Sequence, residues 1–184
     1  MKKIILLIFA LSNYAFSQNT SKVEKSIFGI QATLIGVSVN NEMRLTNQIS
    51  LRSEVGLDGA LFWGTRTKGT GFYLIPDLVI EPRWYYNLEK RVSKGKSIKK
   101  NSGNFLTPSI VYVPDLFVIS SDKSITGVVP RIALIPKWGI KRTIGDHFTY
   151  EVGTGIGYVH YLNNYYNKSS DVIFDIHFKI GYTF

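Results

Sequence analysis

The sequence predicts an all-β fold, a closed, antiparallel, up-and-down transmembrane β-barrel of eight strands. The clearest observation is the segment 171–184, where the apolar residues Val172, Phe174, Ile176 and their successors alternate with mainly polar ones up to the terminal Phe184. Several earlier segments alternate with the same two-residue period. Because successive side chains of a strand point to opposite faces, each segment has one apolar and one polar face. This pattern is typical of an outer-membrane barrel, whose outer face meets lipid and whose lumen is polar.

The strands can be assigned in chain order. An extended segment over residues 27–45 is expected to split near Gly36 into two short strands, because an open strand edge cannot be satisfied in lipid and closure favours an even number. The other six strands are expected at residues 49–58, 72–86, 105–118, 128–140, 148–158 and 171–184. We expect no helix after the N-terminal segment, because no helical periodicity is visible there.

The connections are expected to alternate between the two ends of the barrel. Those at 46–48, 88–103 and 143–146 would face the periplasm together with the C-terminus, and those at 64–71, 120–126 and 163–170 would lie outside. Proline cannot donate to a strand ladder, so prolines within the expected strands argue against a closed ring unless bulges or strand ends absorb them. Six prolines fall there: Pro76, Pro82, Pro108, Pro114, Pro130 and Pro136.

The first 17 residues have the pattern of a secretory signal peptide. Lys2 and Lys3 precede the apolar stretch 4–11, and Ala15-Phe16-Ser17 has the small-x-small spacing of a cleavage site. We therefore divide the chain into a signal peptide, 1–17, and one barrel domain, 18–184; a buried N-terminal helix is the alternative. Export through a cleaved signal makes the outer membrane of a Gram-negative bacterium the expected location.

Composition excludes several classes of protein. The chain has 184 residues, enough for one domain, and 45% of them are hydrophobic, which is too apolar for a disordered chain. No run of 18 apolar residues occurs, so a helical membrane span is not expected. The absence of cysteine excludes disulfides and thiolate metal sites.

Much of the net charge of +9 lies in one expected connection rather than over the whole surface. This basic segment contains Lys90, Arg91, Lys94, Lys96, Lys99 and Lys100. A solvated loop that keeps the turn out of the membrane explains it, and contact with anionic lipid phosphates or a periplasmic partner is the alternative. A local basic loop does not predict nucleic-acid binding.

The apolar parity is expected to carry aromatic girdles at the headgroup layers, where amphipathic rings accumulate. The girdle residues are Trp63, Trp84, Tyr86, Trp138, Tyr150, Tyr158 and Phe184. The alternative is a soluble β-sandwich whose aromatic side chains pack inside.

The polar parity is expected to form a lumen charge network, because isolated buried charges would be too costly. Its members are Glu42, Arg44, Arg52, Glu54, Asp77, Glu81, Arg83, Asp115, Arg131, Lys137, Glu151, Asp175 and Lys179. Salt bridges that fill the lumen are one interpretation, and a polar path for a small solute is the other. Gly153, Gly155 and Gly157 are expected to make room for large neighbours such as arginine or tyrosine.

Chemical motifs are scarce. The three histidines, His147, His160 and His177, have no metal-binding spacing, so we expect no metal and no cofactor. A set of His160 with Ser169 or Ser170 and Asp171 could be imagined for acyl transfer, but no nucleophile motif supports it. We therefore do not expect an enzyme.

Three segments resemble small outer-membrane β-barrel proteins of Bacteroidetes-type bacteria. They are Glu81-Pro82-Arg83-Trp84-Tyr85-Tyr86-Asn87, Asn101-Ser102-Gly103-Asn104 and Ile180-Gly181-Tyr182-Thr183-Phe184. The last of them, through Ile180, Tyr182 and Phe184, is similar to the signal that the barrel-assembly machinery recognises during insertion. The resemblance implies a fold, a location, and outer-membrane lipids and that machinery as partners. It implies no defined activity, and the oligomeric state stays open.

The functional expectation is an integral outer-membrane barrel with a charged, side-chain-filled lumen and a structural or loop-binding role. A narrow porin-like channel for small solutes is the first alternative. A lipid-modifying outer-membrane enzyme is the second.

Overall fold

The computed structural model describes residues 21–63, 70–163 and 168–184. The expected signal peptide, 1–17, lies outside the described residues. None of the helices in the described ranges has the length and apolar character required to cross a membrane.

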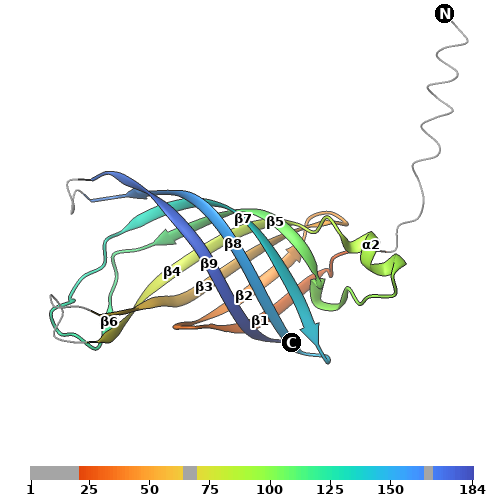
Figure 1. Ribbon diagram of the computed structural model, residues 1–184, viewed down its shortest axis with the longest axis horizontal. Coiled ribbons are helices and arrows are strands. Elements are labelled where there is room, and N and C mark those ends of the chain that lie inside the picture. The colour runs from red at the N-terminus through yellow and green to blue at the C-terminus, as the bar shows by residue number, and fades with distance from the viewer. Residues whose placement is uncertain (1–20, 64–69, 164–167) are drawn as a thin grey trace, which may run out of the picture.

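The described chain is one antiparallel sheet with almost no helix (Figure 1). Its nine strands are β1 (Ser26–Thr33), β2 (Gly36–Arg44), β3 (Ile49–Phe62), β4 (Gly71–Trp84), β5 (Gly103–Val113), β6 (Ile119–Ser120), β7 (Arg131–Ile144), β8 (Phe148–Tyr161) and β9 (Ser170–Thr183). Hydrogen bonds link them in the order β3-β2-β1-β9-β8-β7-β5-β4, and pairing of β3 with β4 completes a ring of eight strands. The short β6 adds to the end of β4. The all-β, antiparallel prediction is confirmed, and eight of the nine strands form the ring.

The extended segment 27–45 divides into β1 and β2 near Gly36, as the sequence predicted. Gly36 has a φ of +154°, and a Cβ atom there would lie 2.5 Å from the carbonyl oxygen of Leu57. Only glycine fits such a close approach to a neighbouring strand. The chain therefore turns after Thr33 and returns as β2.

Two helical segments lie in the described chain, so the prediction of no helix is wrong. They are α2 (Leu88–Ser93) and the 3₁₀ turn η2 (Lys99–Asn101), both within the basic segment. Leu88 is fully buried in a cluster with Val23, Tyr85 and Phe105. A six-residue helix with one buried position is too short to show a helical period in the sequence.

Prolines fix several strand limits. Pro114 directly follows β5 and Pro130 directly precedes β7, so β5 ends earlier and β7 begins later than expected. The other four prolines lie inside strands. The β4–β5 ladder is interrupted between Ile80 and Trp84, around Pro82, and the β7–β8 ladder is interrupted at Pro136. The ring thus tolerates proline by losing ladder bonds locally, because this residue has no N–H to donate.

The two faces of the ring have opposite character. Phe174 and Phe178 are 75% and 52% exposed on the outside, whereas Glu81 and Arg83 are 3% and 1% exposed inside. The predicted parity of the strands therefore holds. At one end the chain termini of the described region, α2 and η2 gather, and at the other a segment from 114 to 130 packs Val128 onto Ile75 and Val113 (Figure 1).

Candidate functional site

The interior of the ring has two levels. Toward the C-terminal end it is filled by charged side chains that come from facing strands. Toward the opposite end it holds a cavity of about 520 Å³. The strand alternation places the ionic residues inside, and the ring brings together groups that lie far apart in the sequence.

Glu151 on β8 is the centre of the charged level. Both of its oxygens accept hydrogen bonds at 2.7 Å from the two terminal nitrogens of Arg83, which reaches across from β4. Arg52 on β3 lies 3.5 Å from the same carboxylate. Arg83 also binds Glu81, and Arg52 binds Glu54, so each guanidinium contacts two carboxylates. This arrangement suits the planar, forked guanidinium group.

Glu42 and Lys141 form the part of the charged level nearest the C-terminal end. Their ion pair measures 2.8 Å, and Ser50 and Asn101 donate hydrogen bonds to Glu42. The Arg83 guanidinium lies 4.2 Å from the centroid of the Phe105 ring, a cation–π geometry. The polar groups and rings together close this end of the interior.

A third set of ion pairs borders the cavity. Lys179 donates to Glu54 at 2.8 Å, and Lys137 lies 3.0 Å from Asp175. His177 lies 2.8 Å from Asp175 and 3.3 Å from the central carboxylate of the network. These ion pairs therefore run without a break from the Arg83–Glu151 pair to the cavity.

Glycines on β8 make the network possible, but their neighbours differ from the expected arginine and tyrosine. A Cβ atom at Gly153 would lie 2.4 Å from the His177 ring, and one at Gly155 would lie 2.8 Å from Cγ of Lys137. At Gly157 the first atoms met belong to the backbone of β7. These positions accept no side chain without displacing a charged neighbour or a strand.

The structure brings together most of the predicted lumen network, with exceptions at its edges. Arg44 donates to the backbone carbonyl of Val23, and Arg131 to that of Val129. Asp115 lies beyond the end of β5 and is exposed, so its predicted interior position is wrong. Pro114 ends the strand and breaks the alternation on which that prediction rested.

Sequence reasoning left several members out of the network, among them Lys141 and Asn101. Lys141 was left out because the expected strand ended at residue 140, whereas β7 continues to Ile144 and keeps the same parity. Asn101 is fully buried although it lies in the basic segment, and its φ of 59° is left-handed. The extension of β7 could have been found from the alternation, but no sequence signal indicated Asn101.

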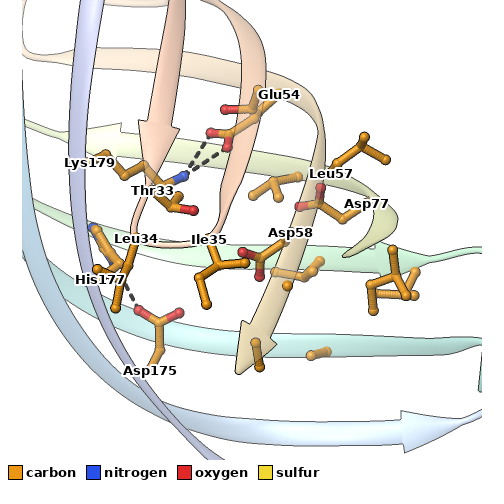
Figure 2. A pocket seen from close by; sticks show the side chains of 18 of the residues that line it. Thr33, Leu34, Ile35, Glu54, Leu57, Asp58, Asp77, Asp175, His177 and Lys179 are labelled. Atoms are coloured by element: carbon orange, nitrogen blue, oxygen red, sulfur yellow. Dashed lines mark hydrogen bonds and ion pairs between the residues drawn. The ribbon is translucent and has the colours of Figure 1, made fainter. Parts of the chain in front are cut away.

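The cavity lies beside the turn between β1 and β2 (Figure 2). Asp58 and Asp77 approach it from β3 and β4, and Asp175, His177 and Lys179 from β9. Glu54, Glu81, Arg131 and Lys137 also line it. Much of the remaining inner wall is apolar and comes from β4, β5, β7, β8 and β9. These wall residues are Ile75, Val79, Val113, Ile135, Val159 and Ile173.

The expected girdle residues lie on the outer face. Trp84 and Tyr86 make an edge-on contact at 5.9 Å, and Trp138 donates to the Tyr86 hydroxyl at 2.8 Å. Trp138 is in the middle of β7, not at its end, and meets the other two because neighbouring strands are staggered. Phe184 packs on Phe28 and Tyr182, where the chain ends.

The other expected girdle residues lie at or near strand ends. Trp63 follows β3 directly and is 78% exposed, and Tyr158 lies near the end of β8. Tyr150 is half-buried near the start of β8.

The basic segment covers the C-terminal end of the ring. Lys100 donates to the carbonyl oxygen of Phe184 at 2.7 Å, and Lys99 pairs with Asp146 in the β7–β8 turn at 2.5 Å. The hydrogen bond and positive charge of Lys99 lower the pKa of the exposed Asp146. The basic segment is thus bonded to the C-terminal residue and to the β7–β8 turn at this end.

The residues considered for acyl transfer do not assemble into a catalytic set. His160 pairs with Ser170 across β8 and β9, but Asp171 belongs to the opposite parity and binds Lys168 at 3.4 Å. No group of three or more potential metal ligands occurs among residues 21–63, 70–163 and 168–184. Comparisons with family models, with curated proteins and with solved structures find no match to this chain.

Proposed function

We propose that the chain is an integral outer-membrane β-barrel protein without enzymatic activity, which stabilises the envelope or presents its outer connections for binding. The carrying observation is the outer face of the ring. Every one of its eight strands exposes large apolar side chains there. A soluble monomer rarely exposes a continuous apolar surface of that extent. Lipid tails are the surroundings in which such a surface is stable.

Strand length and pairing support the same proposal. Five of the strands have 14 residues, and about 9–11 tilted residues cross the hydrocarbon core. A ring satisfies backbone hydrogen bonds between strands, as lipid requires. Soluble β-sandwiches have the opposite arrangement, with the apolar faces inside and the charged faces in water.

The filled level of the interior favours a structural role over a channel. Arg52, Arg83 and Glu151 are each 1% exposed or less and span the ring from β3 and β4 to β8. A small solute would have to break these ion pairs to pass. We therefore place the porin-like channel second and the lipid-modifying enzyme third, since no catalytic set assembles among the described residues to support the latter.

The proposal includes a location and partners. A signal peptide at residues 1–17 would direct export, and the exposed Ile180, Tyr182 and Phe184 would be read by the barrel-assembly machinery of a Gram-negative bacterium. The basic segment would face the periplasm and meet lipid phosphates there.

Two experiments test the proposal. The chain, expressed with its N-terminal segment in a Gram-negative host, should appear in the outer-membrane fraction and migrate differently on gels before and after boiling. Soluble fractionation with identical migration would contradict it. In planar bilayers, the purified protein should carry no steady current; a reproducible unitary conductance would replace the structural role with the channel.

A further inference from the structure

The wall of the ring is lowered at the β1–β2 hairpin. These strands have 8 and 9 residues, whereas their neighbours β3 and β9 have 14. β1 pairs with β9 only from Gly29 to Ala32, so residues 170–179 of β9 have ladder partners on β8 alone. Figure 1 shows that the hairpin stops well short of the other strands at that end.

A lateral gap follows from this pairing. Beyond the hairpin, β3 and β9 are separated by three strand spacings, or about 14 Å along the wall. Their free backbone groups would be costly in lipid and are tolerated where they line a polar cavity. The end of the ring over β4 and β5 is covered by the segment that carries Val128. The lowered wall is on the opposite side of the ring from that cover.

The cavity extends from the interior through this gap to the outer face. Ile176 and Phe178 are 85% and 52% exposed on the outer face, yet both line it. Asp77 and Glu81, on the inner face, line the same cavity. Figure 2 shows the hairpin turn, with Leu34 and Ile35, between the groups of β3 and β9. A ligand in the cavity would thus contact both the membrane side and the interior.

Most charged groups around the cavity already have partners. Glu54 binds Lys179, Glu81 lies 3.7 Å from Lys137, and Asp175 binds His177. Arg131 also lines the cavity and donates to the backbone carbonyl of Val129. In the part of the chain that the structure describes, Asp58 and Asp77 form no ion pair.

Asp77 has the stronger signature of a ligand-binding group. It is only 8% exposed, and its Oδ1 atom has no hydrogen-bond partner among the described residues. A buried carboxylate with an unpaired oxygen is costly. Because Oδ1 itself has no accessible surface, a cation in the cavity would stabilise the carboxylate through its charge, from the exposed side of Asp77, and not by a bond to Oδ1. Gly56, opposite it on β3, holds the space for this carboxylate, since a Cβ there would lie 3.0 Å from Oδ1.

We infer that the cavity binds an amphipathic organic cation that enters sideways between β3 and β9. Its ammonium group would contact Asp58 and Asp77, and its hydrocarbon part would lie on the apolar wall formed by Ile75, Val113 and Ile135. A cavity of about 520 Å³ falls within the usual size of small-molecule sites. A bare divalent ion fits less well, because Ca²⁺ takes six or more oxygen ligands and the described ranges contain no group of three or more acidic or histidine side chains placed to hold a metal ion.

The route through the wall rests on the proposed membrane location, but binding itself does not. The test therefore uses purified protein in octyl glucoside at pH 7.5, with decylamine as the probe and decanol and decanoate as matched chains. Trp63 lines the cavity and reports binding by fluorescence, with Trp63→Phe as the blank. Decylamine should saturate the signal, and the other two should bind at least tenfold more weakly.

Variants identify the groups involved. The double change Asp58→Asn and Asp77→Asn should weaken decylamine binding at least tenfold while gel migration shows that the protein still folds. Asp171→Asn, which removes an exposed acid from the same end, should leave it unchanged. The cation site would be overturned if the double variant bound decylamine as tightly as the unchanged protein, or if the unchanged protein bound decanol as tightly as decylamine.

The entrance has its own test, because the chain contains no cysteine and a single new one can be labelled uniquely. A bulky maleimide on Ile176→Cys, at the gap, should slow decylamine binding at least tenfold. The same label on Leu134→Cys, on the outer face of β7, should not. Equal rates would overturn the sideways route and leave the carboxylate site standing. If the proposed membrane location is wrong, the protein will be missing from the outer-membrane fraction. That outcome is distinct from a loss of decylamine binding and from a change in its binding rate.

Discussion

The central carboxylate of the charged level offers the sharpest test of the interior. Glu151→Gln keeps the shape of the side chain but removes the charge that faces Arg83 at 2.7 Å and Arg52 at 3.5 Å. Two unit charges about 4 Å apart at an effective dielectric of about 20 attract by about 4 kcal/mol. Removing one partner of a buried pair typically costs about 3–5 kcal/mol, because the other charge stays buried. For Glu151→Gln we therefore expect the free energy of unfolding to fall by about 3–5 kcal/mol.

The assay is urea unfolding in detergent, followed by tryptophan fluorescence. Asp171→Asn is the matched control, since its pair with Lys168 is largely exposed and should contribute less than about 1 kcal/mol. Arg83→Met combined with Glu151→Gln should destabilise less than the sum of the single changes, because the pair is then removed together. A loss below about 1 kcal/mol for Glu151→Gln would refute the argument that buried ion pairs hold this interior.

Three further predictions follow from contacts elsewhere in the ring. Gly139→Ala places a Cβ 2.4 Å from the Phe105 ring and should lower the free energy of unfolding by about 1–3 kcal/mol in the same urea assay. Leu134→Lys, on the outer face within β7, should cost about 2–4 kcal/mol in lipid vesicles, whereas Ile144→Lys at the last residue of that strand should cost at most about 1 kcal/mol. Lys99→Met should raise the pKa of Asp146 toward its usual value, measured by NMR titration, because it removes the hydrogen bond and charge that lower that pKa.

Each of these predictions has a result that contradicts it. Gly127, where a Cβ would meet nothing within 4 Å, is the control for the glycine change, and equal stability of the two alanine variants would count against close packing. Equal costs for the two lysine variants would argue that the outer face is not in hydrocarbon. An unchanged Asp146 titration would mean that the contact with Lys99 is not formed in solution.

The sign of the aspartate effect can be stated without an energy. A carboxyl group whose pKa is lowered in the folded state stabilises it above the pKa of the unfolded state, and loses that effect as the pH falls through the folded pKa. Any contribution of Asp146 is therefore absent in acid. Lys99→Met should reduce this acid dependence.

Strand parity, the split hairpin and the inward position of the network could be predicted from the sequence. A strand has a fixed two-residue alternation, so the choice of face for Glu81 or Phe174 is a local property. The break at Gly36 was likewise visible, because glycine marks a backbone position that other residues rarely adopt. Prolines 114 and 130 were misplaced within strands, since only the paired ladder shows where a strand stops.

Contacts between distant residues depended on the tertiary structure. The sequence identified Glu151, Arg52 and Arg83 as interior charges but not as partners, because the stagger and closure of the ring decide which strands face each other. The cavity was not foreseen for the same reason. It arises because the two strands of the first hairpin are shorter than β3 and β9, and a difference in length becomes a gap only when the four strands lie side by side.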